Sequence, residues 1–263
     1  QWVTENIGVN GRFIFIVTEE DYDKYNLQFL LNLLEPNCEI VKVTEPTKGA
    51  AETVLLAKDL ISDGPIAIIN SDQFMNWNSN EFFYAMAADE CDGGIVTFES
   101  THPKWSFVQT GEDGFVTETA EKKPISNMAT AGVYYFRVGS DFVKYAEEMI
   151  KKGLSVNGDY FVCPVFNELI ADKGKVRAFP IDGMWSFSTP EDVTLFVNQY
   201  IDNSVISCKI NNKTFDIYIY PYYKNLGIDN LKSKNNLSKI FSYYVGQLAT
   251  LKKANICELH HMN

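Results

Sequence analysis

The run Arg12-Phe13-Ile14-Phe15-Ile16-Val17 constrains the fold most, because every side chain after Arg12 is apolar. A continuous apolar run of this length is typical of a parallel strand that is buried on both faces. Apolar side chains with helical spacing follow over residues 21–34, so a strand is predicted to lead into a helix. Residues 1–7 have the pattern of a helix without a capping residue, which predicts that the natural chain begins further upstream.

The same alternation continues along the chain. It predicts strands at 39–43, 66–70 and 94–98, with helices at 50–61 and 81–88. Alternation at this spacing implies right-handed crossovers and a mainly parallel, doubly wound sheet of the α/β class. Three successive strands, 105–109, 115–121 and 131–136, then predict an antiparallel excursion. Further elements are predicted as helices at 140–151, 160–171 and 189–200 and a strand at 176–181.

Composition excludes several classes of protein. The 263 residues are 46% hydrophobic, enough for a substantial core, yet no apolar run approaches the roughly 20 residues of a membrane span. The net charge of −11 argues against nucleic acid as a partner. Five cysteines without a C-x-x-C pair indicate free thiols. Together with the absence of a hydrophobic signal core at Gln1, they predict a cytoplasmic protein.

A change of composition near Ser204 predicts two domains, 1–203 and 204–263. The second contains eight lysines against three acidic residues, and its pattern predicts a small α+β appendage with a hairpin, 206–210 and 215–220, and a helix at 237–254. Three interpretations of this segment stay open: it docks on the main sheet, it mediates homo-oligomer formation, or it begins a following domain.

Polar residues that follow strands are the first candidates for a site, because ligands of open α/β sheets bind at the carboxyl ends of the strands. The turn Thr47-Lys48-Gly49-Ala50-Ala51-Glu52-Thr53 has small residues that let a ligand approach the backbone, and an ordinary loop is its alternative. In Ile68-Ile69-Asn70-Ser71-Asp72 a strand runs into a carboxylate, which could hold Mg²⁺ or simply begin a turn.

A third segment combines opposite charges with a glycine. In Glu121-Lys122-Lys123-Pro124, Lys122 could neutralise a phosphate and Glu121 could accept hydrogen bonds from sugar hydroxyls. Gly132, in the following strand, would let a sugar ring lie against the backbone. The alternative is a solvated cluster of charges.

The order and spacing of these segments resemble the sugar-phosphate nucleotidyltransferase family, including its capsule and surface-polysaccharide members and the glucose-1-phosphate thymidylyltransferases. The resemblance covers about residues 1–200 and implies the nucleotide-diphospho-sugar transferase fold. It also implies nucleotide contacts from the first turn, at Lys48, Gly49, Glu52 and Thr53.

The remaining site residues follow from the same resemblance. Asp72 is implied as the metal ligand and, with Lys122, as a catalytic residue. The implied sugar contacts are Glu121, Gly132 and Asp159, the last from Asn157-Gly158-Asp159-Tyr160-Phe161-Val162.

Three departures from the family pattern are visible, and one is that residues 204–263 match no part of it. The N-terminal strand with a G-x-G-x-R phosphate loop is not found in this sequence, so the chain is either a fragment of a longer enzyme or a degenerate copy, and its activity alone stays open. Ser186, in Trp185-Ser186-Phe187-Ser188, stands where many members carry a second metal-binding Asp.

The implied reaction joins an NTP and a sugar 1-phosphate with Mg²⁺, forming a nucleotide sugar for polysaccharide or surface-glycan synthesis and releasing pyrophosphate. Two alternatives remain. One is a glycosyltransferase of the related fold, whose Asp-x-Asp motif Asn70-Ser71-Asp72 approximates with one carboxylate. The other is a non-catalytic domain that binds a nucleotide sugar.

Overall fold

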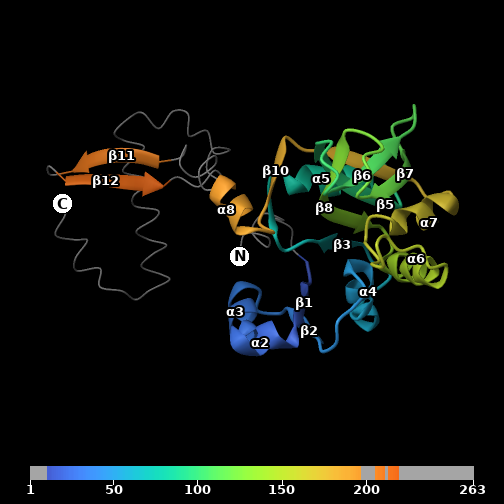
Figure 1. Cartoon of the computed structure of the whole chain (residues 1–263), viewed down its shortest axis with the longest axis horizontal. Helices are drawn as coiled ribbons and strands as arrows, with labels where there is room; N and C mark the ends of the chain where they lie inside the picture. Colours follow the sequence, from blue (N-terminus) through green and yellow to red (C-terminus); the bar gives the residue numbers. More distant parts are fainter. Residues whose placement is uncertain (1–10, 197–204, 211–212, 219–263) are drawn as a thin grey trace. The chain divides into compact units, whose positions relative to one another are not determined.

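The computed structural model describes residues 11–196, 205–210 and 213–218 (Figure 1). The chain divides into two compact units, one up to Thr189 and one from Pro190. The predicted boundary near Ser204 and the helices predicted at 1–7 and 237–254 lie outside the described residues.

The first unit alternates strands and helices as the apolar pattern predicts. Its elements in chain order are β1 (Ile14–Thr18), α2 (Glu19–Lys24), α3 (Leu27–Leu34), β2 (Glu39–Val43), α4 (Ala50–Leu55), η1 (Lys58–Leu60), β3 (Ile66–Ile69), β4 (Gln73–Asn76), α5 (Ser79–Ala88), β5 (Gly93–Glu99), β6 (Ser106–Thr110), β7 (Val116–Glu121), β8 (Met128–Phe136), α6 (Gly139–Lys151), α7 (Val165–Ala171), β9 (Val176–Pro180) and β10 (Gly183–Ser186).

The central sheet has six strands, in the order β7-β6-β8-β5-β9 with β3 beside β8. β3, β5, β6 and β9 run in one direction, while β7 and β8 run in the opposite one. The predicted α/β class with an antiparallel excursion is therefore confirmed: four of the six strands share one direction, although in this sheet only β5 and β9 are paired in parallel. β1 and β2 form a separate parallel pair, and β4 pairs with β10 in a second small sheet.

Helices cover both faces of the central sheet. The side chains of β5 and β8 alternate between these faces, and each face packs into its own apolar cluster. Ile95 and Phe136 belong to the cluster that contains residues of α6 and α7. Val96 and Val133 belong to the cluster beneath α5, where Phe82 is fully buried. Fully buried large side chains on both faces supply the apolar area that stabilises the unit.

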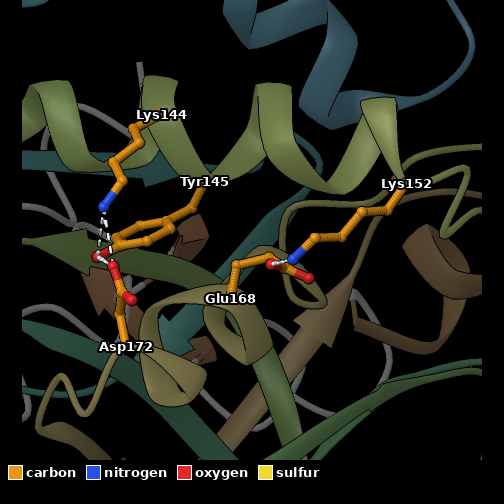
Figure 2. A network of polar contacts seen from close by, with 5 residues as sticks. All are labelled: Lys144, Tyr145, Lys152, Glu168 and Asp172. Atoms are coloured by element: carbon orange, nitrogen blue, oxygen red, sulfur yellow. Dashed lines mark hydrogen bonds and ion pairs between the residues drawn. The ribbon is translucent and has the colours of Figure 1, made fainter.

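Polar contacts attach α6 to α7 on the outer surface of this layer (Figure 2). Lys144 Nζ and Tyr145 Oη both donate to Asp172 Oδ2, at 2.8 and 3.0 Å. Lys152 donates to Glu168, whose side chain is only 8% exposed. The Lys152 ion pair satisfies a carboxylate that is largely removed from water, which would otherwise be costly.

Three element predictions were wrong in their extent. The helix expected over 50–61 ends at Leu55 and is followed by the separate 3-10 helix η1. The helix expected over 21–34 is broken into α2 and α3, because Asn26 adopts the left-handed conformation, with φ 49°. The helix expected from 160 begins at Val165 instead, since Pro164 lacks an N–H and disfavours helical geometry in the residue before it. The short strands β4 and β10 were not predicted at all.

The thiols of the first unit agree with the expectation of free cysteines. Cys91 and Cys163 are buried and Cys38 is partly buried, and none of the three is in a disulfide. Burial raises the pKa of Cys163 well above its ordinary value, which keeps that thiol protonated and inert.

The second unit contains α8 (Pro190–Phe196) and an antiparallel hairpin of β11 (Val205–Ile210) and β12 (Lys213–Tyr218). The hairpin predicted for the last sixty residues is thus confirmed. No helix among the described residues is long and apolar enough to cross a membrane.

Candidate functional site

The candidate site lies around a gap along one edge of β8. Along the other edge, β8 pairs with β5 over its whole length, from Phe136 opposite Gly93 to Met128 opposite Glu99. β3 and β6 must therefore share the remaining edge, where Ile69 pairs with Val133 and Phe107 pairs with Ala129. Residues 130–132, here named the β8 gap, lie between these two pairings. The gap therefore separates the carboxyl end of β3 from the beginning of β6.

The β8 gap is shaped by Gly132, whose φ of +69° is left-handed. The Asn70 N–H donates to the Gly132 carbonyl at 3.0 Å, and the Gln73 amide donates to the Ala131 carbonyl. A Cβ at position 132 would lie 2.5 Å from Gln73 Oε1 and 2.6 Å from Asn70 Nδ2. Protein amides therefore occupy the space beside the Gly132 Cα where a side chain would stand.

Asp72 leaves the end of β3 and is exposed. Its carbonyl accepts the Phe187 N–H, and Ser188 Oγ donates to its carboxylate, both at 2.6 Å. Ser188 Oγ lies 2.8 Å from Ser186 Oγ, and Ser186 is paired with Gln73 across β4 and β10. The fold thus brings Ser186, which stands where many family members carry a metal-binding Asp, beside the Asp72 segment.

The donor set around Asp72 consists of one carboxylate and two hydroxyls. In the part of the chain that the structure describes, no group of three or more His, Cys, Asp or Glu is arranged to hold a metal. Mg²⁺ commonly keeps several waters and is bound through one or two carboxylates together with substrate phosphates. Asp72 fits that mode, in which phosphates supply the remaining charge.

Glu121 and Lys122 lie on the β6 side of the β8 gap. Glu121 ends β7 and is only 9% exposed, and burial raises the pKa of its carboxyl while a hydrogen bond from Ser106 and the charge of Lys122 lower it. Lys122 is exposed, its N–H donates to the Trp105 carbonyl at 3.0 Å, and its φ is +55°. A buried acceptor thus stands next to an accessible ammonium, a pair suited to hydroxyl and phosphate groups.

The predicted nucleotide turn is held by its own side chains. The Glu52 carboxylate accepts the Lys48 N–H, and Thr53 Oγ1 lies 2.5 Å from Thr47 Oγ1 and donates to the Gly49 carbonyl at 3.1 Å. Glu52 and Thr53 therefore stabilise the main chain of this turn, whatever they contact in a ligand.

Residues 156–161, here named the 156–161 turn, contact both of these regions. Val156 and Asp159 exchange two backbone hydrogen bonds around Asn157 and Gly158, whose φ values are 55° and 91°. Two left-handed residues in succession are the geometry for which Asn-Gly is favoured. The turn presents Asp159 to solvent and leads directly into Tyr160 and Phe161.

Tyr160 and Phe161 join the 156–161 turn to its neighbours. The Tyr160 N–H donates to the Lys48 carbonyl at 2.7 Å, and its carbonyl accepts the Ala51 N–H at 2.9 Å. Lys122 Nζ lies 4.6 Å from the centre of the Phe161 ring. The nucleotide turn, Asp159 and Lys122 are therefore brought together, although they are far apart in the sequence.

The predicted site residues thus fall into two groups beside the β8 gap. Asp72 lies on the β3 side with Ser186 and Ser188, while Glu121 lies on the β6 side and Lys122 links it to the 156–161 turn. Sequence reasoning missed the residues that hold these groups: Asn70, Gln73, Ser106, Tyr160 and Ser188. Of these, only Tyr160 had a local signal, because the Asn157-Gly158 dipeptide marks a turn immediately before it.

A surface hollow of about 570 Å³ lies elsewhere, between η1 and α6. Lys58, Glu147 and other charged residues line it, and an ion pair of 3.1 Å crosses it. None of the predicted site residues lines this hollow.

Comparisons with known proteins agree with this fold. The sequence model of the nucleotidyl transferase family matches residues 6–186. The nucleoside-diphosphate-sugar pyrophosphorylase of Vibrio cholerae RC9 has 25% sequence identity and a TM-score of 0.62, over 72% of this chain and 82% of that one. A UDP-glucose pyrophosphorylase complexed with UDP-glucose has 17% identity and a TM-score of 0.57, over 76% and 84% of the two chains. No curated protein sequence gives a significant match.

Proposed function

Because the chain belongs to the nucleotidyl transferase family, we propose that it joins a nucleoside triphosphate to a sugar 1-phosphate and releases pyrophosphate. The observation that carries this proposal is the contact of the 156–161 turn with both the Lys48 segment and Lys122. The contact supports the proposal because the Lys48 segment, proposed for the nucleotide, and Lys122, proposed for the sugar phosphate, both meet this turn. The product, a nucleotide sugar, would serve polysaccharide or surface-glycan synthesis.

In the proposed reaction, an oxygen of the sugar 1-phosphate attacks the α-phosphorus of the triphosphate. The bond from that phosphorus to the bridging oxygen breaks, and its electrons leave with pyrophosphate. In such a reaction the protein mainly positions the two substrates and neutralises the charge on their phosphates. Lys122 is the proposed cation for the attacking phosphate, and the buried Glu121 carboxylate is the proposed acceptor for sugar hydroxyls.

The nucleotide side of the proposed site consists of Lys48, Gly49, Glu52 and Thr53. Gly132 and Asp159 complete the sugar side. Asp72 would hold Mg²⁺, which would supply positive charge to the phosphates when bound. The protein's own contribution there is the Ser188 hydroxyl, which orients the Asp72 carboxylate. We expect this chemistry in the cytoplasm, because the buried thiols at Cys91 and Cys163 suit a reducing compartment.

Pyrophosphate release tests the proposal. The protein is incubated with Mg²⁺, glucose 1-phosphate and each common nucleoside triphosphate in turn. We expect release with one triphosphate, and a loss of about 100-fold or more for Asp72→Asn and Lys122→Met, as for removal of a charge that acts in the transition state. Lys123→Met is the matched control, since it removes a neighbouring exposed lysine.

Other outcomes would overturn the proposal. Full activity of Asp72→Asn would refute the assigned role of that carboxylate. Sugar transfer from a preformed nucleotide sugar without consumption of triphosphate would instead identify a glycosyltransferase. Calorimetric binding of a nucleotide sugar without turnover would identify a binding domain.

A further inference from the structure

The 156–161 turn contacts both the nucleotide side and the sugar-phosphate side of the proposed site. Tyr160 makes two main-chain hydrogen bonds to the first side, and Phe161 lies under Lys122 on the second. Consecutive residues therefore hold segments that are more than 70 positions apart in the sequence.

The contact with the nucleotide side leaves no room for adjustment. Gly49 has φ +97°, and a Cβ on it would lie 2.5 Å from the Tyr160 carbonyl oxygen and 2.8 Å from the Tyr160 nitrogen. Both atoms belong to the backbone, so neither can move aside as a side chain would. Tyr160 itself packs against the core cluster that includes Val162 and Cys163. The nucleotide turn is thus attached to a segment that is anchored in the core.

We propose that Tyr160 is a positioning residue that couples the two sides, so that a nucleoside triphosphate and a sugar 1-phosphate bind with positive cooperativity. This inference rests on the proposed function for the identity of the two ligands. Because this contact is tight, a displacement of the Lys48–Ala51 main chain by one ligand would be passed to the 156–161 turn through the shared hydrogen bonds. The second ligand would then bind a turn that already has its bound position, and by linkage the effect is reciprocal.

The first test needs no ligand and uses amide hydrogen exchange. In Gly49→Ala, the new Cβ cannot coexist with the Tyr160 backbone, so the two segments must separate. We expect exchange to accelerate about tenfold or more in peptides covering 47–56 and 156–163 together. Gly114→Ala is the matched control: Gly114 has φ +80°, and a Cβ added to it would meet nothing within 4 Å, so only its own turn should respond.

This comparison can fail clearly. If Gly49→Ala accelerates exchange in 47–56 while 156–163 keeps the rate of the unaltered protein, the two segments are not coupled and the inference is wrong. Should Gly49→Ala not fold, Phe161→Leu replaces it, since leucine keeps apolar volume but removes the ring beneath Lys122. Exchange in 119–124 should then accelerate, and an unchanged rate there would overturn the link on that side.

The second test adds the ligands to the unaltered protein. A triphosphate from the pyrophosphate assay should slow exchange in 156–163 as well as in 47–56. In buffer without Mg²⁺, where no product forms, it should also raise the affinity for glucose 1-phosphate at least about 5-fold by calorimetry. Protection confined to 47–56, with unchanged affinity, would refute the coupling. If neither ligand changes exchange anywhere, the proposed function fails, and the positioning role of Tyr160 is decided by the ligand-free comparison.

Discussion

Gly132→Ala tests whether the shape of the β8 gap is set by the protein itself. Two costs add in this variant. An alanine at φ +69° adopts the left-handed conformation at a cost of about 1–2 kcal/mol. Its Cβ would also lie within 2.6 Å of the Asn70 and Gln73 amides, so both side chains must move.

Displacement of Gln73 carries the larger consequence. Its amide donates to the carbonyl of Ala131, a residue that is fully buried. A buried carbonyl without a donor costs about 1–3 kcal/mol. Gly132→Ala should therefore lower the free energy of unfolding by about 2–5 kcal/mol in total, which corresponds to a Tm lower by roughly 4–20 °C for a unit of this size.

Urea unfolding followed by tryptophan fluorescence measures this loss, and Gly153→Ala is the matched control. Gly153 has φ +70° with nothing within 4 Å of a Cβ, so its substitution should cost only the backbone strain, about 1–2 kcal/mol. The double variant Gln73→Ala/Gly132→Ala should lose less than the sum of its single variants, because the clash of the new Cβ with Gln73 is then relieved. Equal losses for Gly132→Ala and Gly153→Ala would refute the reasoning.

Two further predictions concern charge. Glu121→Gln should raise the free energy of unfolding at pH 7, because burial raises the pKa of the Glu121 carboxyl and its ionised form then opposes folding. The gain should vanish at about pH 3, which is below the pKa of the unfolded carboxyl and leaves the carboxyl protonated in both states. Urea titrations that give an equal gain at both pH values would contradict it. Lys152→Met should destabilise the protein more than Lys144→Met, because the side chain of its partner Glu168 is 8% exposed whereas that of Asp172 is 58% exposed. Unfolding in urea at low and high NaCl checks this, since only the Lys144 effect should be largely screened, and equal losses would speak against it.

Local sequence was sufficient for most strands of the first unit. The apolar runs in β1 and β3 are continuous, and those in β2 and β5 are interrupted only by Lys42 and Thr97. All four are bounded by helical patterns, so strand and helix periods differ clearly. β4 and β10 have only four residues each and pair across more than 100 positions, which leaves no local period to detect. The break at Asn26 was likewise invisible to periodicity, because one left-handed residue interrupts a helix without changing its apolar spacing.

The sequence by itself determined the α/β class and the position of Asp72 at the end of a strand, because both follow from patterns within a few neighbouring residues. It also pointed to Gly49 and Gly132 as special positions. Only the tertiary structure decided that the Tyr160 backbone stands beside the first glycine and the Gln73 and Asn70 amides beside the second. A glycine in the sequence permits a close approach to the chain, but whether protein, ligand or nothing comes close depends on which distant segments the packed core brings together.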